Sequence, residues 1–366
     1  MIGIIGGYGD VGLHAARALQ DSATSCLKIG GRNPGAAQVR LGAEFPGATW
    51  ARVDINEEKS LDAFIDGCEL VVNCAGPSHM TSARVAKRCL ARGCHHVDAG
   101  VSDELEAMSG TPHGTTVVYG AGATPGLSEL LPLWLSGGFD RVESLTAYTG
   151  VLDRFTASGA EDYLVGVLGG TNEPLAAWRE GARCSSALGR RAHVSLPTFP
   201  REVTLYPYLD AESEFVARKL SLRNGAWHLV VDGTHMASSL EGAHAQFVAD
   251  ADIAVKELCK ASALDAAGRR TYVKFLVELA GVRGGTALAR TVMLESHGIS
   301  FLTGSVAAAV AMTVLDKKVP GGVYPLMNIP GPENVIMKLR EGLGSHHVTI
   351  WDCSIEDLRF EVEGVL

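Results

Sequence analysis

The chain has 366 residues, a formal net charge of −9 and a pI near 5.7. Nucleic-acid surfaces need concentrated Lys and Arg, and the sequence has no basic stripe, so we expect no nucleic-acid partner. Its apolar stretches, such as 304–315, are too short and interrupted to cross a bilayer, and the N-terminus begins a strand instead of a charged leader. We expect a cytoplasmic protein of two domains, because this length exceeds what one core usually supports.

The N-terminus carries a glycine motif between a predicted strand and a predicted helix. An apolar strand over residues 2–5 is followed by Gly7-x-Gly9-x-x-Gly12 and by a helix over 11–20. In a dinucleotide site, these glycines allow a tight turn, close approach of backbone to a diphosphate, and close packing of helix on strand. The free N–H groups of the helix then face the phosphates. We therefore predict a Rossmann-type doubly wound parallel sheet whose first loop binds a dinucleotide through Gly7, Tyr8, Gly9, Asp10, Val11 and Gly12.

The end of the second predicted strand, 26–31, indicates which dinucleotide binds. An NAD site places an acidic residue here against the ribose 2′-hydroxyl. The sequence instead continues from Gly31 into Arg32 and Asn33, so a cation is present where a 2′-phosphate needs one. This pattern favours NADP(H), with Arg32 as the selecting residue.

Further strand and helix patterns alternate up to residue 120, as a doubly wound sheet requires. Ligands of such sheets bind beyond the carboxyl ends of the strands. We expect the third strand to end near the adenine, and the apolar strand 70–75 and the strands 95–98 and 117–120 to end near the nicotinamide. The additional cofactor-binding residues predicted at these ends are Asp54, Ile55, Cys74, Ala75, Gly76, Pro77, Ala99, Gly122, Thr124 and Pro125.

After about residue 140 the pattern changes to alternating, antiparallel-type strands, which predicts a second α/β or α+β domain. We place the nucleotide domain at 1–125, completed by 303–366, and the substrate and dimerisation domain at 126–302. Within the latter, the patterns predict strands at 141–150, 203–208, 226–231 and 287–297. They predict helices at 249–263 and 272–280, and an Ala-rich helix at 303–316 that returns to the first domain.

The eight cysteines include no CxxC pair, so we expect reduced thiols in packing roles. Cys89, Cys94, His95 and His96 form one cluster, but their spacing is not that of the usual zinc sites. We predict no metal.

The chain resembles the saccharopine dehydrogenase-like oxidoreductases. The resemblance rests on GGYGDVG at 6–12, VVNCAGPSH at 71–79, GCHHVDAG at 93–100, GAGATPGLS at 120–128 and the Ala-rich helix followed by KKVPGGVYP. It implies a Rossmann domain, an α/β substrate domain that often mediates dimerisation, and hydride transfer with NAD(P), in many members at a carbon–nitrogen bond. Two features depart from the amino-acid-forming saccharopine reductases: Thr124 replaces an acid, and a Ser-Tyr pair near 100–101 is missing. A less charged or carrier-tethered imine therefore fits at least as well as saccharopine.

Reduction of a C=N bond needs a proton source near the nitrogen. The predicted catalytic residues are His79, Asp98 and Tyr148, and Asp153, Tyr163 and His235 are further candidates. Each also has a structural interpretation. His79 could lie exposed in a loop, Asp98 could bind backbone amides, the tyrosines could be core residues, and the composition around His235 indicates a turn.

The sequence thus favours an NADPH-dependent reductase that transfers hydride to a C=N bond and acts as a homodimer. It is either an imine reductase, with a cyclic imine or thiazoline among its candidate substrates, or an enzyme that forms secondary amines of the saccharopine or opine type. Two alternatives stay open. One is an enoyl reductase acting in trans on a carrier-bound chain, for which we find no apolar helical insertion in the sequence. The other is a protein that binds NADP without turnover.

Overall fold

The computed structural model describes residues 1–22, 26–168, 172–341 and 346–358. Its contacts divide the chain into two compact units, each built from two separate segments. The first unit comprises 1–130 and 300–346, and the second comprises 131–299 and 347–366. None of the described helices has the length and hydropathy that a membrane span needs. The fold class predicted from the sequence, a Rossmann-type α/β fold with a second mixed domain, is confirmed.

The first unit is a parallel sheet with the strand order β16-β6-β5-β4-β1-β2-β3. Strand and helix alternate along the chain, and the sheet is wound outward from β1 in both directions. Its strands are β1 (Ile2–Ile5), β2 (Leu27–Gly31), β3 (Thr49–Arg52), β4 (Leu70–Asn73), β5 (His95–Asp98), β6 (Thr116–Tyr119) and β16 (Gly322–Pro325). Its helices are α1 (Asp10–Ser22), α2 (Pro34–Leu41), α3 (Glu58–Ile65), α4 (Ser78–Ala91), α5 (Asp103–Ala107), α11 (Ile299–Leu315), η2 (Leu326–Asn328) and α12 (Pro332–Glu341).

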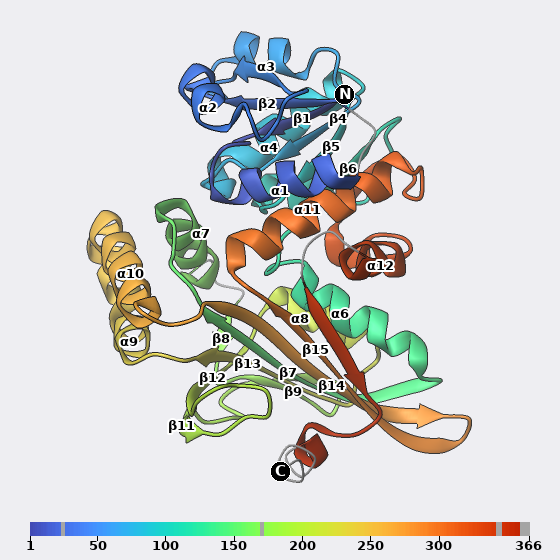
Figure 1. The fold of residues 1–366 in the computed structure, drawn as a ribbon. Coiled ribbons are helices and arrows are strands. Elements are labelled where there is room, and N and C mark those ends of the chain that lie inside the picture. The colour runs from blue at the N-terminus through green and yellow to red at the C-terminus, as the bar shows by residue number, and fades with distance from the viewer. Residues whose placement is uncertain (23–25, 169–171, 342–345, 359–366) are drawn as a thin grey trace. The chain divides into compact units, whose positions relative to one another are not determined.

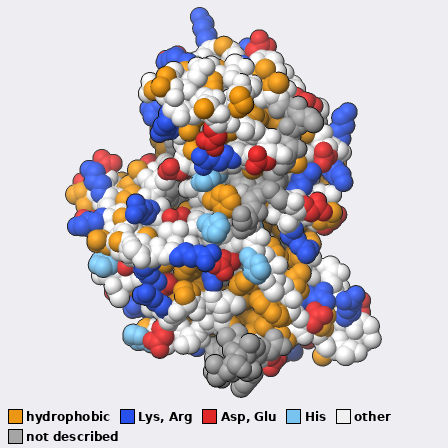
Figure 2. All heavy atoms as spheres, in the orientation of Figure 1, with side chains coloured by type: hydrophobic (Ala, Val, Ile, Leu, Met, Phe, Trp, Pro, Cys, Tyr) orange, Lys and Arg blue, Asp and Glu red, His pale blue; other side chains and the backbone are white. Residues whose placement is uncertain are grey.

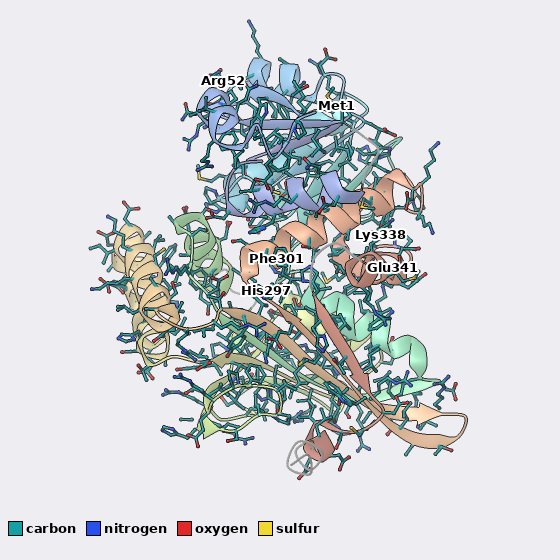
Figure 3. The ribbon with its side chains drawn as sticks, in the orientation of Figure 1. Met1, Arg52, His297, Phe301, Lys338 and Glu341 are labelled. Carbon is teal, nitrogen blue, oxygen red and sulfur yellow. The ribbon has the colours of Figure 1, made fainter. Side chains whose placement is uncertain are left out.

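Helix α11 brings the late segment of the chain back to the first sheet. It lies beside α1 (Figure 1), and a Cβ on Gly304 would come within 2.6 Å of the Val11 carbonyl oxygen. Phe301, labelled in Figure 3, contacts the His14 ring edge-on with centroids 5.1 Å apart. After this helix, β16 pairs in parallel with β6. The small residues of α11, which read as an Ala-rich pattern in the sequence, therefore permit close helix packing.

The second unit is built on a mixed sheet with the central order β10-β9-β13-β7-β14-β15-β17. Strands β13 and β7 are parallel, and β7, β14, β15 and β17 follow one another antiparallel. Its strands are β7 (Arg141–Leu152), β8 (Glu173–Pro174), β9 (Ala177–Arg179), β10 (Ala182–Cys184), β11 (Arg191–Val194), β12 (Val203–Leu209), β13 (Asn224–Val231), β14 (Tyr272–Arg283), β15 (Thr286–Ser296) and β17 (His347–Trp351). Its helices are η1 (Ser136–Gly138), α7 (Ala157–Leu168), α8 (Ala211–Lys219), α9 (Thr234–Ala249) and α10 (Ala251–Ala266), and α6 (Leu127–Leu135) spans the division between the units.

The cores of the second unit explain how its helices are held. Val216 and Ala217 of α8 pack on the sheet with the buried Trp178 and Trp227. Helices α7, α9 and α10 lie together (Figure 1) around a separate cluster that includes Leu164 and Leu258. These helices form a helical layer of their own beside the sheet.

Three sequence expectations differ from the structure in the second unit. Residues 272–280 form strand β14 instead of a helix, because both faces of the segment are buried between β7 and β15. His235 lies in the first turn of helix α9, not in an isolated turn. Strand β17 pairs with β15 in the second sheet, whereas the sequence analysis assigned 303–366 to the first domain. Residues 342–345 and 359–366 of that segment lie outside the described residues.

Candidate functional site

The glycine motif forms the turn between β1 and α1. Gly6 has φ +71°, in the left-handed region, and its carbonyl oxygen accepts the N–H of Gly9 at 2.9 Å. A Cβ on Gly12 would lie 2.1 Å from that same carbonyl oxygen. No side chain fits at position 12 without moving the backbone, so this glycine allows α1 to start directly against the turn.

Gly9 is open on the side that a ligand would occupy. A Cβ at this position would have the Gly6 carbonyl oxygen, at 3.2 Å, as its single protein neighbour within 4 Å among the described residues. Asp10, Val11 and Gly12 form the first turn of α1, whose leading N–H groups have no partner within the helix. An uncovered glycine beside free amides at a helix N-terminus is a cradle that fits a diphosphate.

The end of β2 supplies the adenosine side of the candidate site. Gly31 is the last residue of β2, and Arg32 and Asn33 connect it to α2, which begins at Pro34. The Arg32 side chain is exposed and makes no ion pair within the described residues. Many other cations of this unit are paired, for example Arg17 with Glu44 and Arg88 with Asp62, and Figure 2 shows acidic and basic side chains intermixed on the visible face. Arg32 is therefore available to an anion.

The end of β3 adds a cation that the sequence analysis did not select. Arg52, labelled in Figure 3, is the last residue of β3 and pairs with Gly31 in the strand register. Its guanidinium binds Glu57 through two hydrogen bonds of 3.1 and 3.2 Å, which raise the pKa of Arg52 further. Asp54 and Ile55 follow, and the Asp54 N–H donates to the Ser60 hydroxyl.

Asp98 is the centre of a buried hydrogen-bond network at the ends of β4 and β5. Its side chain, 2% exposed, accepts hydrogen bonds from Asn73 Nδ2 (2.9 Å), Ser82 Oγ (2.8 Å) and the Gly100 N–H (2.9 Å). His96 Nε2 lies 3.1 Å from the same carboxylate, and His96 is fully buried. Asp98 was a predicted catalytic residue, but these contacts use its oxygens to hold two strand ends and α4 together. The geometry favours a positioning role.

The loop between β4 and α4 is fixed by the same region. Cys74, Ala75, Gly76 and Pro77 make up this loop, whose Gly76–Pro77 peptide bond is cis. The Thr81 hydroxyl donates to the carbonyl oxygens of Ala75 (2.9 Å) and Pro77 (3.1 Å). After β5, Ala99 and Gly100 follow, and a Cβ on Gly100 would lie 2.2 Å from Ser78 Cβ in the first turn of α4.

His79 occupies the first turn of α4, directly after this loop, and its side chain is exposed. The residue before the helix is Pro77, and no side chain caps the helix. His79 follows the end of β4 and Asp98 is the last residue of β5, and these two strands are neighbours in the sheet. His79 is an exposed residue there, whereas the Asp98 carboxylate is enclosed.

The buried Glu129 carboxylate fixes the loop after β6 through hydrogen bonds. Gly122, Thr124 and Pro125 lie in this loop, and the Thr124–Pro125 bond is cis. The Glu129 carboxylate, in a residue 6% exposed, accepts the Gly126 N–H at 2.7 Å and the Ser128 hydroxyl at 2.8 Å. Gly126 has φ +121°, and a Cβ there would lie 2.0 Å from the Gly120 carbonyl oxygen. The loop thus presents its backbone at the same sheet edge as β1, β4 and β5.

Tyr148, the third predicted catalytic residue, lies in the second unit on β7. Its ring stacks on His228 with centroids 4.8 Å apart and an interplanar angle of 19°. Burial lowers the pKa of His228 to about 4, so this imidazole is neutral near pH 7. Tyr163 is enclosed in the helical layer, and burial raises its pKa to about 12. The environment of Tyr163 favours a packing role for its ring.

His235 and Asp265 form a pair that the sequence did not indicate, because they are 30 residues apart on two helices. His235 Nδ1 lies 2.8 Å from the Asp265 carboxylate, which also accepts the N–H groups of His235 and Met236. The His235 side chain is 54% exposed, and that of Asp265 is 6% exposed. Asp265 takes the place of an N-cap for α9, and it orients an imidazole that is more than half exposed.

All eight cysteines are free thiols in the structure, and no cluster of potential metal ligands occurs among the described residues. Cys89 Sγ lies 3.9 Å from His96 Nδ1 inside the first unit, and a hydrogen bond with Cys94, together with burial, raises the pKa of Cys89. The polar groups next to Cys89, those of His96 and Cys94, are part of the packed core.

Residues 2–118 match the family model of the saccharopine dehydrogenase NADP binding domain. The matched range runs from β1 into β6. The residues of the glycine turn, the β2–α2 loop and the Asp98 network all lie within the matched range, and the cofactor of the domain is NADP(H).

Two solved structures share the fold over nearly the whole chain. Apo saccharopine dehydrogenase (L-Glu forming) from Saccharomyces cerevisiae has a TM-score of 0.71 and 14% identity, covering 96% of this chain and 99% of that chain. Homospermidine synthase from Legionella pneumophila, in complex with NAD, has a TM-score of 0.57 and 10% identity, covering 96% and 92%. No curated protein sequence matches the chain. At these identities, the likeness shows a common fold.

Proposed function

We propose that the protein is an NADPH-dependent reductase that transfers hydride to a C=N bond. The observation that carries this proposal is the saccharopine dehydrogenase-type NADP-binding domain at 2–118, within a chain whose whole fold resembles saccharopine dehydrogenase and homospermidine synthase. Saccharopine and homospermidine are both secondary amines, the class of product that reduction of an imine gives.

Different residues of the first unit would bind different parts of the cofactor. Backbone amides of Gly9 to Gly12 would hold the diphosphate, and Arg32 the 2′-phosphate. The loops 74–77 and 120–126 would border the nicotinamide, since both follow strands next to β1 or β5. When bound, NADPH supplies the hydride, and the protein must supply the proton for the nitrogen.

We assign that proton to His79. A protonated imidazole can give a proton to the nitrogen of the C=N bond. His79 is exposed at the strand edge, whereas the oxygens of Asp98 are occupied by buried partners. Asp98 would act through α4, by fixing Ser82 and the start of the helix that carries His79. Tyr148 stays the candidate of the second unit, with its ring stacked on His228.

The substrate we propose is a cyclic imine, a thiazoline or another weakly charged imine, free or tethered to a carrier protein. Thr124 is an exposed, uncharged residue in the β6 loop, where an acid would suit a cationic amino-acid substrate. Efficient turnover of saccharopine, or of lysine with 2-oxoglutarate, would contradict this substrate class. We further propose a homodimer, which light scattering on the purified full chain would test.

The reaction can be tested by screening NADPH consumption with cyclic imines, thiazolines, enoyl thioesters and ketones, with mass spectrometry of the products. The proposal expects secondary amines from the imine substrates. His79→Gln should lower kcat by about a hundredfold, the lower part of the range for general acid catalysis, and leave the Kd for NADPH unchanged. His235→Gln is the matched control, because it removes another exposed imidazole, in the other unit.

Three results would contradict the proposal in different ways. Consumption of NADPH with enoyl thioesters alone would establish C=C reduction. Tight NADPH binding without turnover of any compound would establish a non-catalytic protein. A large loss in His235→Gln with normal His79→Gln would move the proton donor to the second unit.

A further inference from the structure

Tyr8 links two loops that a Rossmann site normally connects through the cofactor. It lies in the glycine turn after β1, and its hydroxyl accepts the N–H of Asn33, in the loop after β2, at 2.7 Å. A Cβ on Gly31 would lie 2.3 Å from the Tyr8 hydroxyl oxygen and 2.4 Å from the ring carbon that carries it. The Tyr8 side chain thus covers the end of β2 and is bonded to the residue two positions beyond it.

We propose that the Tyr8 hydroxyl is a specificity determinant for the phosphorylated adenosine of NADP(H). It would act in two ways: by excluding an acidic side chain at the end of β2, and by positioning Arg32 toward the 2′-phosphate. The proposal concerns the adenosine half of the cofactor. It therefore holds whatever bond the enzyme reduces.

Tyr8 would exclude an acidic side chain at the end of β2 because its hydroxyl occupies the space that such a side chain needs. NAD sites bind the ribose 2′-hydroxyl through a carboxylate at the end of the second strand. At Gly31, the Tyr8 hydroxyl occupies the volume in which such a side chain would begin. A larger residue at 31 must displace the Tyr8 ring, and displacement breaks the hydrogen bond to Asn33.

The positioning follows from the two fixed neighbours of Arg32. Gly31 is paired in the sheet with Arg52 of β3, and Asn33 is held by Tyr8. Asn33 is the residue before α2, and its own side chain does not cap the helix, so the Tyr8 contact is what fixes its amide. Arg32 lies between these points with its side chain exposed. Restricting its backbone lowers the entropy that the guanidinium loses when it binds an anion.

The hydroxyl can also contact the phosphate itself. A phenol can accept one hydrogen bond and donate another, and a phosphate oxygen only accepts. Within the described residues, the Tyr8 hydroxyl makes no hydrogen bond besides the one it accepts from Asn33, so its own proton is available. A 2′-phosphate near Arg32 would therefore meet a neutral donor as well as a cation.

The decisive experiment is calorimetric titration of the full chain and of Tyr8→Phe with NADPH, NADH and 2′,5′-ADP. Tyr8→Phe keeps the ring and removes the hydroxyl. We expect a loss of about three- to tenfold in affinity for NADPH and 2′,5′-ADP, the size of one hydrogen bond, with NADH affinity almost unchanged. Tyr324→Phe is the matched control, because it removes a hydroxyl of the same unit that contacts the Gly321 carbonyl oxygen.

Equal losses for all three ligands, or no loss, would overturn the role of the hydroxyl, and 2′,5′-ADP makes this independent of the hydride chemistry. A second pair of variants tests the exclusion. Gly31→Asp alone should weaken NADPH binding without improving NADH binding, and Gly31→Asp with Tyr8→Ala should bind NADH more tightly than Gly31→Asp does. Improved NADH binding by Gly31→Asp alone would show that Tyr8 excludes nothing. Circular dichroism checks the fold of each variant, and Tyr8→Phe keeps the test valid if the double variant fails to fold.

Discussion

Asp98 in the first unit and Asp265 in the second unit are both buried carboxylates that fix the first turns of a helix, α4 and α9 respectively. They differ in whether the side chains that they bind are exposed. The side-chain partners of Asp98, which are Asn73, Ser82 and His96, are themselves buried. Asp265 binds two backbone amides of α9 and one imidazole, that of His235, which reaches solvent. In the first unit, buried side chains organise the strand ends, so ligand contacts there must come mainly from backbone amides and exposed residues.

The sharpest test of this view is to disturb the backbone of the first unit. In Gly12→Val, a Cβ would lie 2.1 Å from the Gly6 carbonyl oxygen, so the turn must move away from α1. We expect the affinity for NADPH to fall by about a thousandfold, or roughly 4 kcal/mol. Fluorescence titration of NADPH measures the change. Gly35→Ala is the control, since a Cβ there meets no atom within 4 Å, and retained binding by Gly12→Val would exclude the turn as the diphosphate site.

The two carboxylates can be compared directly by truncation. Asp98→Ala leaves the Ser82 hydroxyl, the Asn73 amide and the Gly100 N–H without their acceptor inside the protein. We expect a loss of about 3 kcal/mol in the free energy of unfolding, because buried donors lose a charged partner. Asp265→Ala should cost about 1 kcal/mol, the usual effect of losing a helix cap. Urea unfolding measures both, and equal losses would mean that the two sites serve the same structural purpose.

Much of the first unit could be predicted from local sequence. The glycine turn, the apolar strands and the strand-end loops each depend on residues within one short segment, and the repeated strand–helix alternation fixes the topology. Asp98 could be placed at the correct edge, but its role could not, because Asn73, Ser82 and His96 come together only when β4, β5 and α4 pack. The same holds for Tyr8 and Asn33, which are far apart in sequence.

The second unit was less predictable for physical reasons. The segment 272–280 is apolar on both faces, and such a run fits a buried strand or a buried helix equally well. Long-range pairing with β7 and β15 decides in favour of the strand. Helix α9 lacks a capping side chain next to it in sequence, because its cap is Asp265, supplied by α10. These are contacts between distant segments, which no local pattern records.

The stacked pair Tyr148–His228 offers a pH test that is confined to the second unit. Burial lowers the pKa of His228 from 6.5 to about 4 in the folded state, so the unfolded chain takes up the proton first as the pH falls. His228 therefore does not lower the free energy of unfolding above about pH 6.5, and it lowers this free energy progressively as the pH falls from there to about pH 4. At about pH 4.5 we expect a cost of roughly 2 kcal/mol, which His228→Phe should remove while keeping the stack. An unchanged pH dependence of urea unfolding in this variant would assign the titration to another group.

The smallest expected effect concerns the exposed cation of the first unit. Arg32→Ala should weaken NADPH binding by about tenfold through loss of a charge-assisted contact, and it should barely change NADH binding. Arg201→Ala, an exposed cation of the second unit, controls for net charge in the same titration. Because Arg32 makes no ion pair among the described residues, its removal leaves no carboxylate unpaired, and the change in affinity reports the ligand contact alone. Equal loss of affinity for both nucleotides would indicate that Arg52, not Arg32, binds the 2′-phosphate. Arg52 would then have to release Glu57 before it binds the cofactor.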